Sequence, residues 1–379
     1  MVARADAEAL DARDPLAGFR GRFVIADPEL IYLDGNSLGR LPVATRDRMV
    51  ALTEQWATGL VGGWDEWLDA PRRAGDALAP VLGARPGEVV VTDSVTVNLY
   101  KLAAAAHRGG ALVTARGSFP TDRYVLEGLA AQRGVELRLV AEPEIDGAGL
   151  VVWSHVDYRT GELADVPGLT EHCRAAGVPL IWDLCHSAGA VPVELDAVGA
   201  QLAVGCTYKY LNAGPGAPAF LYVAEALQAE LRSPIWGWFA QRDQFDMERP
   251  YDPMPGVERF LAGTPPIIGL AAVETGARIT ADAGIDAIRA KSVAQLELLV
   301  DCIPDGVELA SPRDAERRGS HVALQHPDAR ALNDRLIEAK VVGDFRTPDV
   351  IRLAVAPLYT RYVDVWDAMN RLRSLIRPT

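Results

Sequence analysis

Five short apolar runs constrain the fold of this chain more than any other feature. They span residues 88–92, 110–115, 149–154, 178–183 and 200–204. Each run is apolar at consecutive positions rather than at every second one, which is the pattern of strands that are covered on both faces. Ala- and Leu-rich stretches of helical character separate the runs. The alternation predicts an α/β domain with a mainly parallel central sheet between layers of helices.

The character of the sequence changes near residue 267. From there we expect two amphipathic helices, two short strand-like pieces and a final helix, at residues 271–279, 285–303, 306–310, 321–324 and 362–375. Such a mixture is typical of an α+β domain. We therefore expect a large α/β domain over residues 46–267 and a smaller α+β domain formed by residues 1–45 together with 268–379.

Charge and cysteine usage exclude several classes of protein. The chain has 38 Lys and Arg against 51 Asp and Glu, and the net charge of −13 does not favour nucleic acid or an anionic membrane surface. No stretch approaches the roughly 20 apolar residues of a membrane span, and residues 1–14 lack the apolar core of a signal peptide. We expect a cytoplasmic protein without nucleic-acid, membrane or metal partners. Four cysteines without CxxC spacing are expected to be buried free thiols: Cys173, Cys185, Cys206 and Cys302.

An acid and a lysine follow the last two apolar runs. Asp183 ends the run at 178–183, and Lys209 lies 26 residues later in a small polar turn beyond the run at 200–204. Enzymes that use pyridoxal 5'-phosphate (PLP) need a lysine to form an imine with the cofactor's aldehyde and an acid to pair with its pyridine nitrogen. In α/β sheets, ligands collect beyond the carboxyl ends of strands, where Asp183 falls. The pair therefore predicts a PLP site.

Each of these residues also has a simpler interpretation. Most lysines are solvated surface residues, but the apolar neighbours of Lys209 argue against this. Asp183 could be a helix N-cap or a turn acid, although an unpaired carboxylate at the end of an apolar strand is costly. His186 could orient Asp183 or stack on the cofactor, whereas a lone histidine is more often a satisfied core residue.

Two further turns follow strands and could contact a cofactor. After residues 88–92, Ser94 or Thr96 opens an Ala-rich helix, either as a simple cap or as a cap that also binds phosphate. The pattern does not separate these two interpretations. In the second turn, Phe119 could cover one face of a flat cofactor with Asp122 as a polar anchor, or the segment is an ordinary Pro-containing turn.

One arginine, Arg352, lies inside the apolar run at 350–359. A buried guanidinium needs a carboxylate partner, either from Asp or Glu of the protein or from a substrate. An amino-acid substrate would supply that carboxylate.

Together these motifs resemble the kynureninase family, which are class V members of the fold type I PLP enzymes. The resemblance implies PLP as the cofactor and a large domain built on a mainly parallel, seven-stranded type of sheet, with a smaller α+β domain. It rests on the order and spacing of six motifs: Gly-Asn-Ser-Leu-Gly at 35–39, Thr-Val-Asn-Leu at 96–99, Phe-Pro-Thr-Asp at 119–122, Asp-x-x-His-Ser-Ala-Gly at 183–189, Tyr-Lys-Tyr-Leu-Asn at 208–212 and Gly-Thr-Pro-Pro at 263–266.

The resemblance implies a set of cofactor-binding residues. Lys209 would form the imine and Asp183 would pair with the pyridine nitrogen. Trp238 and Thr264 match positions that reach the cofactor from the partner subunit, which implies a homodimer with shared active sites. The other implied cofactor contacts are Val95, Thr96, Phe119, Asp122, His186 and Tyr208.

The resemblance also implies a substrate site and a reaction. Arg352 would bind the α-carboxylate of the substrate, with Ser37 and Trp64 near its aromatic end. The implied reaction is hydrolysis of L-kynurenine to anthranilate and L-alanine by cleavage of the Cβ–Cγ bond, with 3-hydroxykynurenine as a second candidate substrate. Lys209 would move the α-proton, and Tyr208 would either donate a proton to the alanine-derived carbanion or only bind phosphate.

Two alternatives to this reaction remain open. The first is another class V lyase, such as a cysteine desulfurase or selenocysteine lyase. Those enzymes usually have His before the lysine and a mobile catalytic cysteine, whereas this chain has Tyr208 before Lys209. The second is a PLP-binding protein that has kept the fold and lost turnover, although every catalytic position expected from the family is filled.

Overall fold

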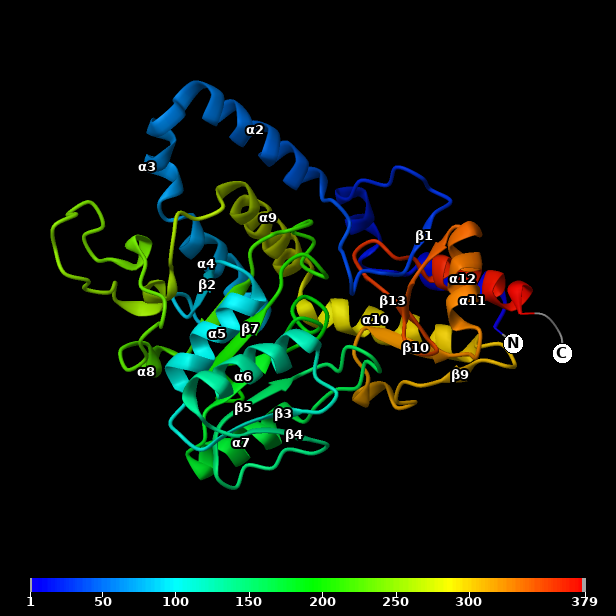
Figure 1. Cartoon of the computed structure of the whole chain (residues 1–379). Helices are drawn as coiled ribbons and strands as arrows, with labels where there is room; N and C mark the ends of the chain where they lie inside the picture. The colour runs from blue at the N-terminus through cyan, green and yellow to red at the C-terminus, as the bar shows by residue number, and fades with distance from the viewer. Residues whose placement is uncertain (1, 377–379) are drawn as a thin grey trace.

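Two lobes lie side by side in the structure (Figure 1). The lobe on the left contains a seven-stranded sheet, and the lobe on the right contains a four-stranded sheet and both ends of the chain. The computed structural model describes residues 2–376. Residue 1 and residues 377–379, at the ends of the expected smaller domain, lie outside the described part.

The large sheet is mainly parallel, as predicted. Its order is β2-β8-β7-β6-β5-β3-β4, and the pairs are parallel except for the two that involve β8. The predicted fold class is therefore confirmed. The strands are β2 (Val89–Val91), β3 (Ala111–Ala115), β4 (Leu137–Val140), β5 (Ala148–Ser154), β6 (Leu180–Asp183), β7 (Leu202–Gly205) and β8 (Phe220–Val223).

The five apolar runs form β2, β3, β5, β6 and β7, but the sequence did not predict β4 and β8. The edge strand β4 has one neighbour, and three of its four residues are partly exposed, so it carries no continuous apolar run. The fully buried β8 does carry an apolar run, Phe220–Val223, directly after a Gly- and Pro-rich segment at 213–218, and the prediction overlooked it. Only β4 lacked the signal on which the prediction relied.

Helices cover both faces of the large sheet. Val89 and Val91 of β2 face one layer and Val90 faces the other, and all three are fully buried. On one face lie α4 (Ala70–Leu82), α7 (Val166–Ala176) and α9 (Ile267–Ala283). On the other face lie α5 (Val95–Ala106) and α6 (Pro120–Arg133). The helix expected at 271–279 lies within α9, so the packing of the large sheet extends past residue 267.

The smaller lobe is built on an antiparallel sheet of order β12-β13-β10-β9. The parallel pair β1 and β11 and the contact of α1 with α12 join the N-terminal residues to this lobe. Its elements are α1 (Arg4–Asp11), β1 (Ile31–Tyr32), α10 (Ile285–Asp301), β9 (Glu308–Leu309), β10 (His321–Gln325), α11 (Ala329–Glu338), β11 (Val341–Val342), β12 (Asp344–Arg346), β13 (Val350–Ala354) and α12 (Tyr362–Leu375).

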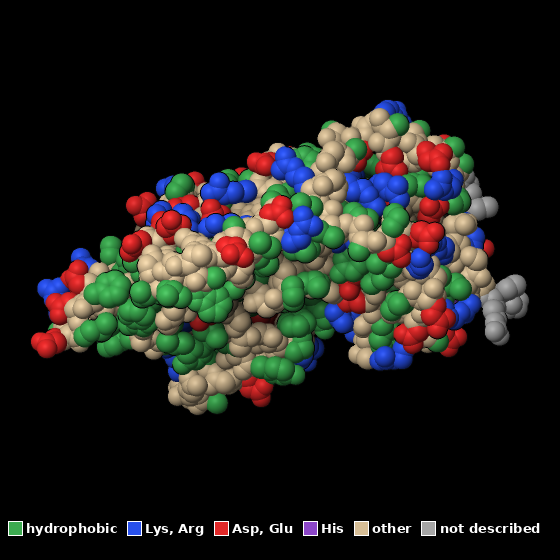
Figure 2. All heavy atoms as spheres, turned by 90° about the horizontal axis from the view of Figure 1, so that it is seen from above, with side chains coloured by type: hydrophobic (Ala, Val, Ile, Leu, Met, Phe, Trp, Pro, Cys, Tyr) green, Lys and Arg blue, Asp and Glu red, His purple; other side chains and the backbone are tan. Residues whose placement is uncertain are grey.

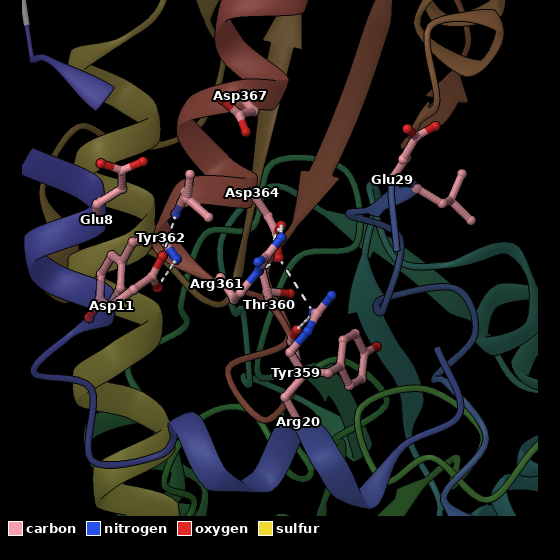
Figure 3. A network of polar contacts seen from close by, with 12 residues as sticks. Glu8, Asp11, Arg20, Glu29, Tyr359, Thr360, Arg361, Tyr362, Asp364 and Asp367 are labelled. Carbon is pink, nitrogen blue, oxygen red and sulfur yellow. Dashed lines mark hydrogen bonds and ion pairs between the residues drawn. The ribbon is translucent and has the colours of Figure 1, made fainter. Parts of the chain in front are cut away.

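A polar network fixes the N-terminal residues to the start of α12 (Figure 3). The carboxylate of Asp11 accepts hydrogen bonds from the backbone N–H groups of Tyr362, at 2.7 Å, and Val363, at 3.0 Å. Arg20 donates to the carbonyl of Tyr359 and lies 3.5 Å from Asp364. These contacts hold the segment that precedes β1 against the segment that follows β13.

A long helix, α2 (Val43–Gly59), connects the two lobes and leads to η2 (Leu60–Gly63) and α3 (Trp64–Trp67) (Figure 1). Figure 2 views the molecule from above and shows hydrophobic side chains gathered on the face that is at the top in Figure 1. No helix among residues 2–376 is long and apolar enough to span a membrane. Large hydrophobic side chains exposed on α2, η2, the 232–262 segment and the start of α9 are Val50, Trp56, Leu60, Val61, Trp236, Trp238, Phe245, Met247 and Ile268.

Candidate active site

Lys209 lies in a tight turn beyond the carboxyl end of β7. The backbone N–H of Gly39 donates to the carbonyl of Tyr208 at 2.8 Å, and Asn212 donates its N–H to the carbonyl of Lys209 at 2.9 Å. A Cβ at Gly39 would lie 2.3 Å from the carbonyl oxygen of Lys209, so the N-terminal loop can approach this turn only with glycine at that position. The turn is therefore held between the large lobe and residues 35–39.

Two acids meet beyond the neighbouring strands. Asp183 ends β6, where its Oδ1 accepts the N–H of Cys185 at 2.9 Å and its Oδ2 lies 3.4 Å from Oγ of Ser154. Asp122, in the first turn of α6, is fully buried close to Asp183. Burial and the charge of Asp183 raise the pKa of Asp122 well above its usual value, against the opposing charge of Lys209. The environment of Asp122 therefore favours its neutral form over the ionised one.

The groups around Lys209 fit PLP. Two adjacent buried acids suit the protonated nitrogen of a pyridine ring, because such a pair is costly without a cation or a donor opposite it. The backbone N–H groups of Val95 and Thr96 begin α5 and have no acceptor among the described residues, so they can bind a phosphate. Oγ of Ser94 accepts a long hydrogen bond of 3.4 Å from the N–H of Val97. Ser94 therefore acts as a simple cap of α5.

Aromatic side chains flank this space. Phe119 is 45% exposed and packs edge-on against Tyr158, with ring centroids 5.3 Å apart. His186 is buried and lies edge-on to His321 at 5.3 Å. Burial and the charge of Lys209 keep the pKa of His186 well below its usual value, so the ring is neutral. No hydrogen bond joins His186 to Asp183 among the described contacts, which favours ring packing over orientation of the acid.

Arg352 lies in the middle of β13 with its guanidinium buried. Its Nε donates to Oδ1 of Asp344 at 2.7 Å, its Nη2 also donates to Asp344, and its Nη1 donates to the carbonyl of Tyr158. Nη2 lies 3.4 Å from Oγ of Ser37, so Ser37 and Arg352 are neighbours. A carboxylate of the protein therefore pairs with Arg352. Asp344 could not be predicted from the sequence, because its position opposite Arg352 depends on the register of β12 and β13.

A second acid, Asp34, lies in the same region and was also missed. Burial and the charge of Asp344 raise its pKa to about 6, against the hydrogen bond from Ser37 and the charges of Arg352 and Arg346. Only its place one residue before the Gly-Asn-Ser-Leu-Gly motif could have drawn attention to it.

Three residues predicted for the site lie elsewhere in the single chain. Trp64 packs against Trp67 and Phe239 at ring distances of 5.6 and 6.0 Å. It follows the far end of α2, whose 17 residues span about 25 Å, so it is separated from Ser37. Trp238 is 40% exposed, and Thr264 is exposed in the turn before α9. The structure therefore brings Trp64 and Trp238 near one another, and not near Arg352.

Tyr208 and the thiols of Cys185 and Cys206 lie close to the turn that contains Lys209. Burial, followed by the proximity of Cys206, raises the pKa of Tyr208, so its hydroxyl stays protonated at neutral pH. Cys206 Sγ lies 3.5 Å from the carbonyl oxygen of Cys185, at the ends of the adjacent strands β7 and β6. Within residues 2–376, no group of three or more His, Cys, Asp and Glu side chains is placed to hold a metal ion.

Comparison with known sequences gives matches along the whole chain. Residues 288–372 match the family described as the kynureninase C-terminal domain. The chain is 42% identical over 400 residues to a kynureninase of Burkholderia pseudomallei strain K96243, and 43% identical to one of Pseudomonas fluorescens. Each alignment covers 99% of this chain and 96% of the relative.

Comparison with solved structures shows the same fold at low sequence identity. The cysteine desulfurase of Thermococcus onnurineus NA1 superposes with a TM-score of 0.83 at 19% identity, covering 95% of this chain and 97% of that one. A mutant of C-DES with glycine covalently linked to its PLP cofactor superposes with a TM-score of 0.82 at 18% identity, covering 98% and 99%. These similarities concern the fold alone.

Proposed function

This chain belongs to the kynureninase family, and from that premise we propose how its residues carry out the reaction of the family. The protein is a PLP-dependent enzyme that hydrolyses L-kynurenine to anthranilate and L-alanine by cleaving the Cβ–Cγ bond. Similarity along 99% of the chain carries this conclusion, since the fold itself is shared with cysteine desulfurases. The roles of single residues, the range of substrates and the assembly are proposals.

The first proposal concerns the cofactor. When bound, PLP supplies an electron-withdrawing ring that stabilises the negative charge left on the substrate when bonds to its α- and β-carbons break. Lys209 would hold it through Nζ, and Asp183, with Asp122 close beside it, would pair with the ring nitrogen. Phe119 and His186 would cover the ring. The phosphate would lie at the start of α5, bound by Val95, Thr96 and Tyr208.

The second proposal concerns proton movement. Once the substrate has replaced Lys209 on the cofactor, the free amine of Lys209 can remove the α-proton of the substrate. The same amine can later give this proton back at another atom. Water adds to the γ-carbonyl, and the Cβ–Cγ bond then breaks to release the aromatic acid. Tyr208 holds a proton at neutral pH and lies next to Lys209, whose Nζ is 5.9 Å from the tyrosine ring centroid. We propose that Tyr208 donates this proton to Cβ of the alanine fragment.

The third proposal places the substrate. Arg352 would bind its α-carboxylate beside Ser37, the side on which the N-terminal loop contacts the lysine turn. The aromatic ring of the substrate would extend toward the Trp64 side chain that the second subunit brings to the site. We propose a preference for unsubstituted kynurenine, because the resemblance matches Thr264 to a position at which family members that favour 3-hydroxykynurenine tend to carry Asn.

Assembly is the fourth proposal. Trp64, Trp238 and Thr264 lie apart from Arg352 in the single chain, on the side with many exposed hydrophobic side chains. We propose a homodimer in which these residues complete the partner's active site. An exposed apolar surface of this kind marks an association site, and a two-fold dimer would bury it in both copies.

Mixing two inactive variants tests the shared site. In a mixed dimer of Lys209→Ala and Trp238→Ala chains, one site carries both changes and the other carries neither. Statistical exchange makes half of the dimers mixed, so about one quarter of wild-type activity should return. Recovery close to zero after verified subunit exchange would exclude a site shared in this way.

Product formation tests the reaction itself. Purified holoenzyme should release fluorescent anthranilate from L-kynurenine, and kcat/KM for kynurenine should exceed that for 3-hydroxykynurenine. Release of sulfide from cysteine without anthranilate from kynurenine would instead favour the desulfurase alternative. An intact cofactor absorbance without either product would indicate a protein that has lost turnover.

A further inference from the structure

Four charged side chains meet where the N-terminal loop touches the smaller sheet. Arg352 and Arg346 both contact the carboxylate of Asp344, with Nε of Arg352 at 2.7 Å and Nη2 of Arg346 at 2.6 Å. Asn36 connects Asp34 to this group, since its amide nitrogen donates to Asp34 at 3.0 Å and its amide oxygen accepts from Arg352 at 3.3 Å. The charges of Asp34, Asp344, Arg346 and Arg352 balance.

Asp344 fixes the direction of Arg352. It takes both donors on the Nε–Nη2 edge of the guanidinium. Nη1 donates to the carbonyl of Tyr158, and Nη2 has only the long contact to Ser37 and the contact to Asn36 besides Asp344. A guanidinium has five N–H groups, so the Nη1–Nη2 end keeps hydrogen-bonding capacity for one more carboxylate. A substrate carboxylate would therefore bind at that end.

A third carboxylate would leave this buried group with an excess negative charge. Such an excess is costly unless one of the acids becomes protonated. Asp344 is a poor candidate, because the hydrogen bond and charge of Arg352 lower its pKa although burial opposes this. Asp34 is the better candidate, because burial and then the charge of Asp344 raise its pKa to about 6.

The other titratable groups near Asp34 keep their charge at these pH values. Tyr32, Tyr210 and Tyr359 have pKa values raised by burial and stay neutral, and the guanidinium of Arg40 lies over the rings of Tyr32 and Tyr359. Next to Arg352, burial lowers the pKa of His321 to about 3, so this histidine is neutral too. Asp34 is therefore the group in this surrounding that changes charge near neutrality.

We propose that the substrate's carboxylate binds at the Nη1–Nη2 end of Arg352, which Asp344 orients as a positioning residue, and that Asp34 takes up a proton as the carboxylate arrives. This inference rests on the proposed role of Arg352. No bond forms or breaks; one proton moves from solvent to the carboxylate of Asp34. Substrate binding thus restores the charge balance of the cluster.

Proton uptake by Asp34 makes the affinity for the carboxylate depend on pH. Below about pH 6, Asp34 is protonated before and after binding, so no proton moves and binding is tightest. Above pH 6, free Asp34 is ionised and each binding event consumes a proton, so affinity falls as pH rises until the higher pKa of the bound state is passed. For a rise of about 1.5 pKa units on binding, affinity at pH 7.5 should be roughly tenfold weaker than at pH 5.5.

The experiment uses the holoenzyme and 4-(2-aminophenyl)-4-oxobutanoate, which is kynurenine without its α-amino group. This probe keeps the carboxylate and the ring, and it has no α-amine whose titration would add to the signal. Calorimetry at pH 7 in two buffers with different ionisation heats gives the number of protons taken up. We expect roughly 0.5–1 proton for the wild type, none for Asp34→Asn, and an affinity for Asp34→Asn that does not change with pH.

Two further variants separate positioning from structure. Asp344→Asn should weaken binding and also move the midpoint of the pH profile to lower pH, because the charge that raises the pKa of Asp34 is gone; a purely structural role would not move the midpoint. Asp305→Asn, in an exposed turn, changes net charge equally and should match the wild type.

The failures are distinguishable. Wild-type binding without proton uptake, or equal uptake by Asp34→Asn, would overturn the inference. If Arg352→Gln binds the probe as tightly as the wild type, then the proposed carboxylate site fails and the inference fails with it. If Arg352→Gln loses binding but Asp34→Asn behaves as the wild type, only the inference about Asp34 fails.

Discussion

Gly39 is the position where a single methyl group tests the packing of the lysine turn. A Cβ at this residue would lie 2.3 Å from the carbonyl oxygen of Lys209 and 2.4 Å from Oδ1 of Asn212. Atoms do not approach this closely, so Gly39→Ala must push the turn away from residues 35–39. Overpacking of this kind costs about 1–3 kcal/mol of unfolding free energy, or about 1–4 °C in Tm for a chain of this size. Displacement of a reacting group by about 1 Å costs roughly a hundredfold in turnover.

We therefore expect Gly39→Ala to fold, bind PLP and lose about 100-fold in kcat for L-kynurenine. Anthranilate fluorescence measures kcat, and calorimetry of the holoenzyme measures Tm. Gly128 provides the matched control, because it lies in α6 and a Cβ there meets no atom within 4 Å. Gly128→Ala should raise stability by about 0.5–1 kcal/mol and leave kcat unchanged. Wild-type kcat and Tm for Gly39→Ala would refute the argument that this contact positions Lys209.

Three other variants have defined outcomes. Lys209→Ala should lose the visible absorbance of the lysine-bound cofactor together with all turnover, and persistence of that absorbance would mean that another lysine holds PLP. Tyr208→Phe should lower kcat by about 10²–10⁴-fold with little change in KM if Tyr208 donates a proton, whereas weaker PLP binding with normal kcat at saturating PLP would assign it to the phosphate alone. Asp11→Ala removes the side chain that caps α12, so denaturant unfolding should show a loss of about 1 kcal/mol while kcat stays the same.

The elements that could be predicted from the sequence are those whose signal is local. Strands such as β6, buried on both faces, leave an uninterrupted apolar run that few other structures produce. The edge strand β4 faces solvent in part, so its alternating residues do not stand out from a loop. Asp183 and Lys209 were predicted as site residues for the same local reason, since Asp183 ends one predicted strand and Lys209 lies shortly after another.

The rest of the site depends on contacts between distant segments. Asp344 meets Arg352 through the register of β13 with β12, which had no clear strand signal, and Asp34 is linked to Arg352 through Asn36 from the other end of the chain. Residue spacing could not show that α2 separates Ser37 from Trp64, because this follows from the direction of a helix and not from its sequence. Long-range geometry of this kind decides which predicted residues share one site.

Because cysteine desulfurases share this fold, the fold alone does not distinguish this chain from them, and the cysteines must be compared. A sulfur-accepting cysteine must be a thiolate that can reach the substrate. Cys173 and Cys302 lie in the two hydrophobic cores, where burial raises the pKa of each thiol. Cys185 and Cys206 contact each other after the ends of β6 and β7, and none of the four cysteines is exposed. Although burial opposes it, the neighbouring Cys185 and Lys209 lower the pKa of Cys206, but this thiol is buried. The acid and the lysine serve PLP chemistry in general, and a carboxylate site at Arg352 would accept any amino acid, so Tyr208 is the residue that we propose directs the chemistry toward cleavage of a carbon–carbon bond.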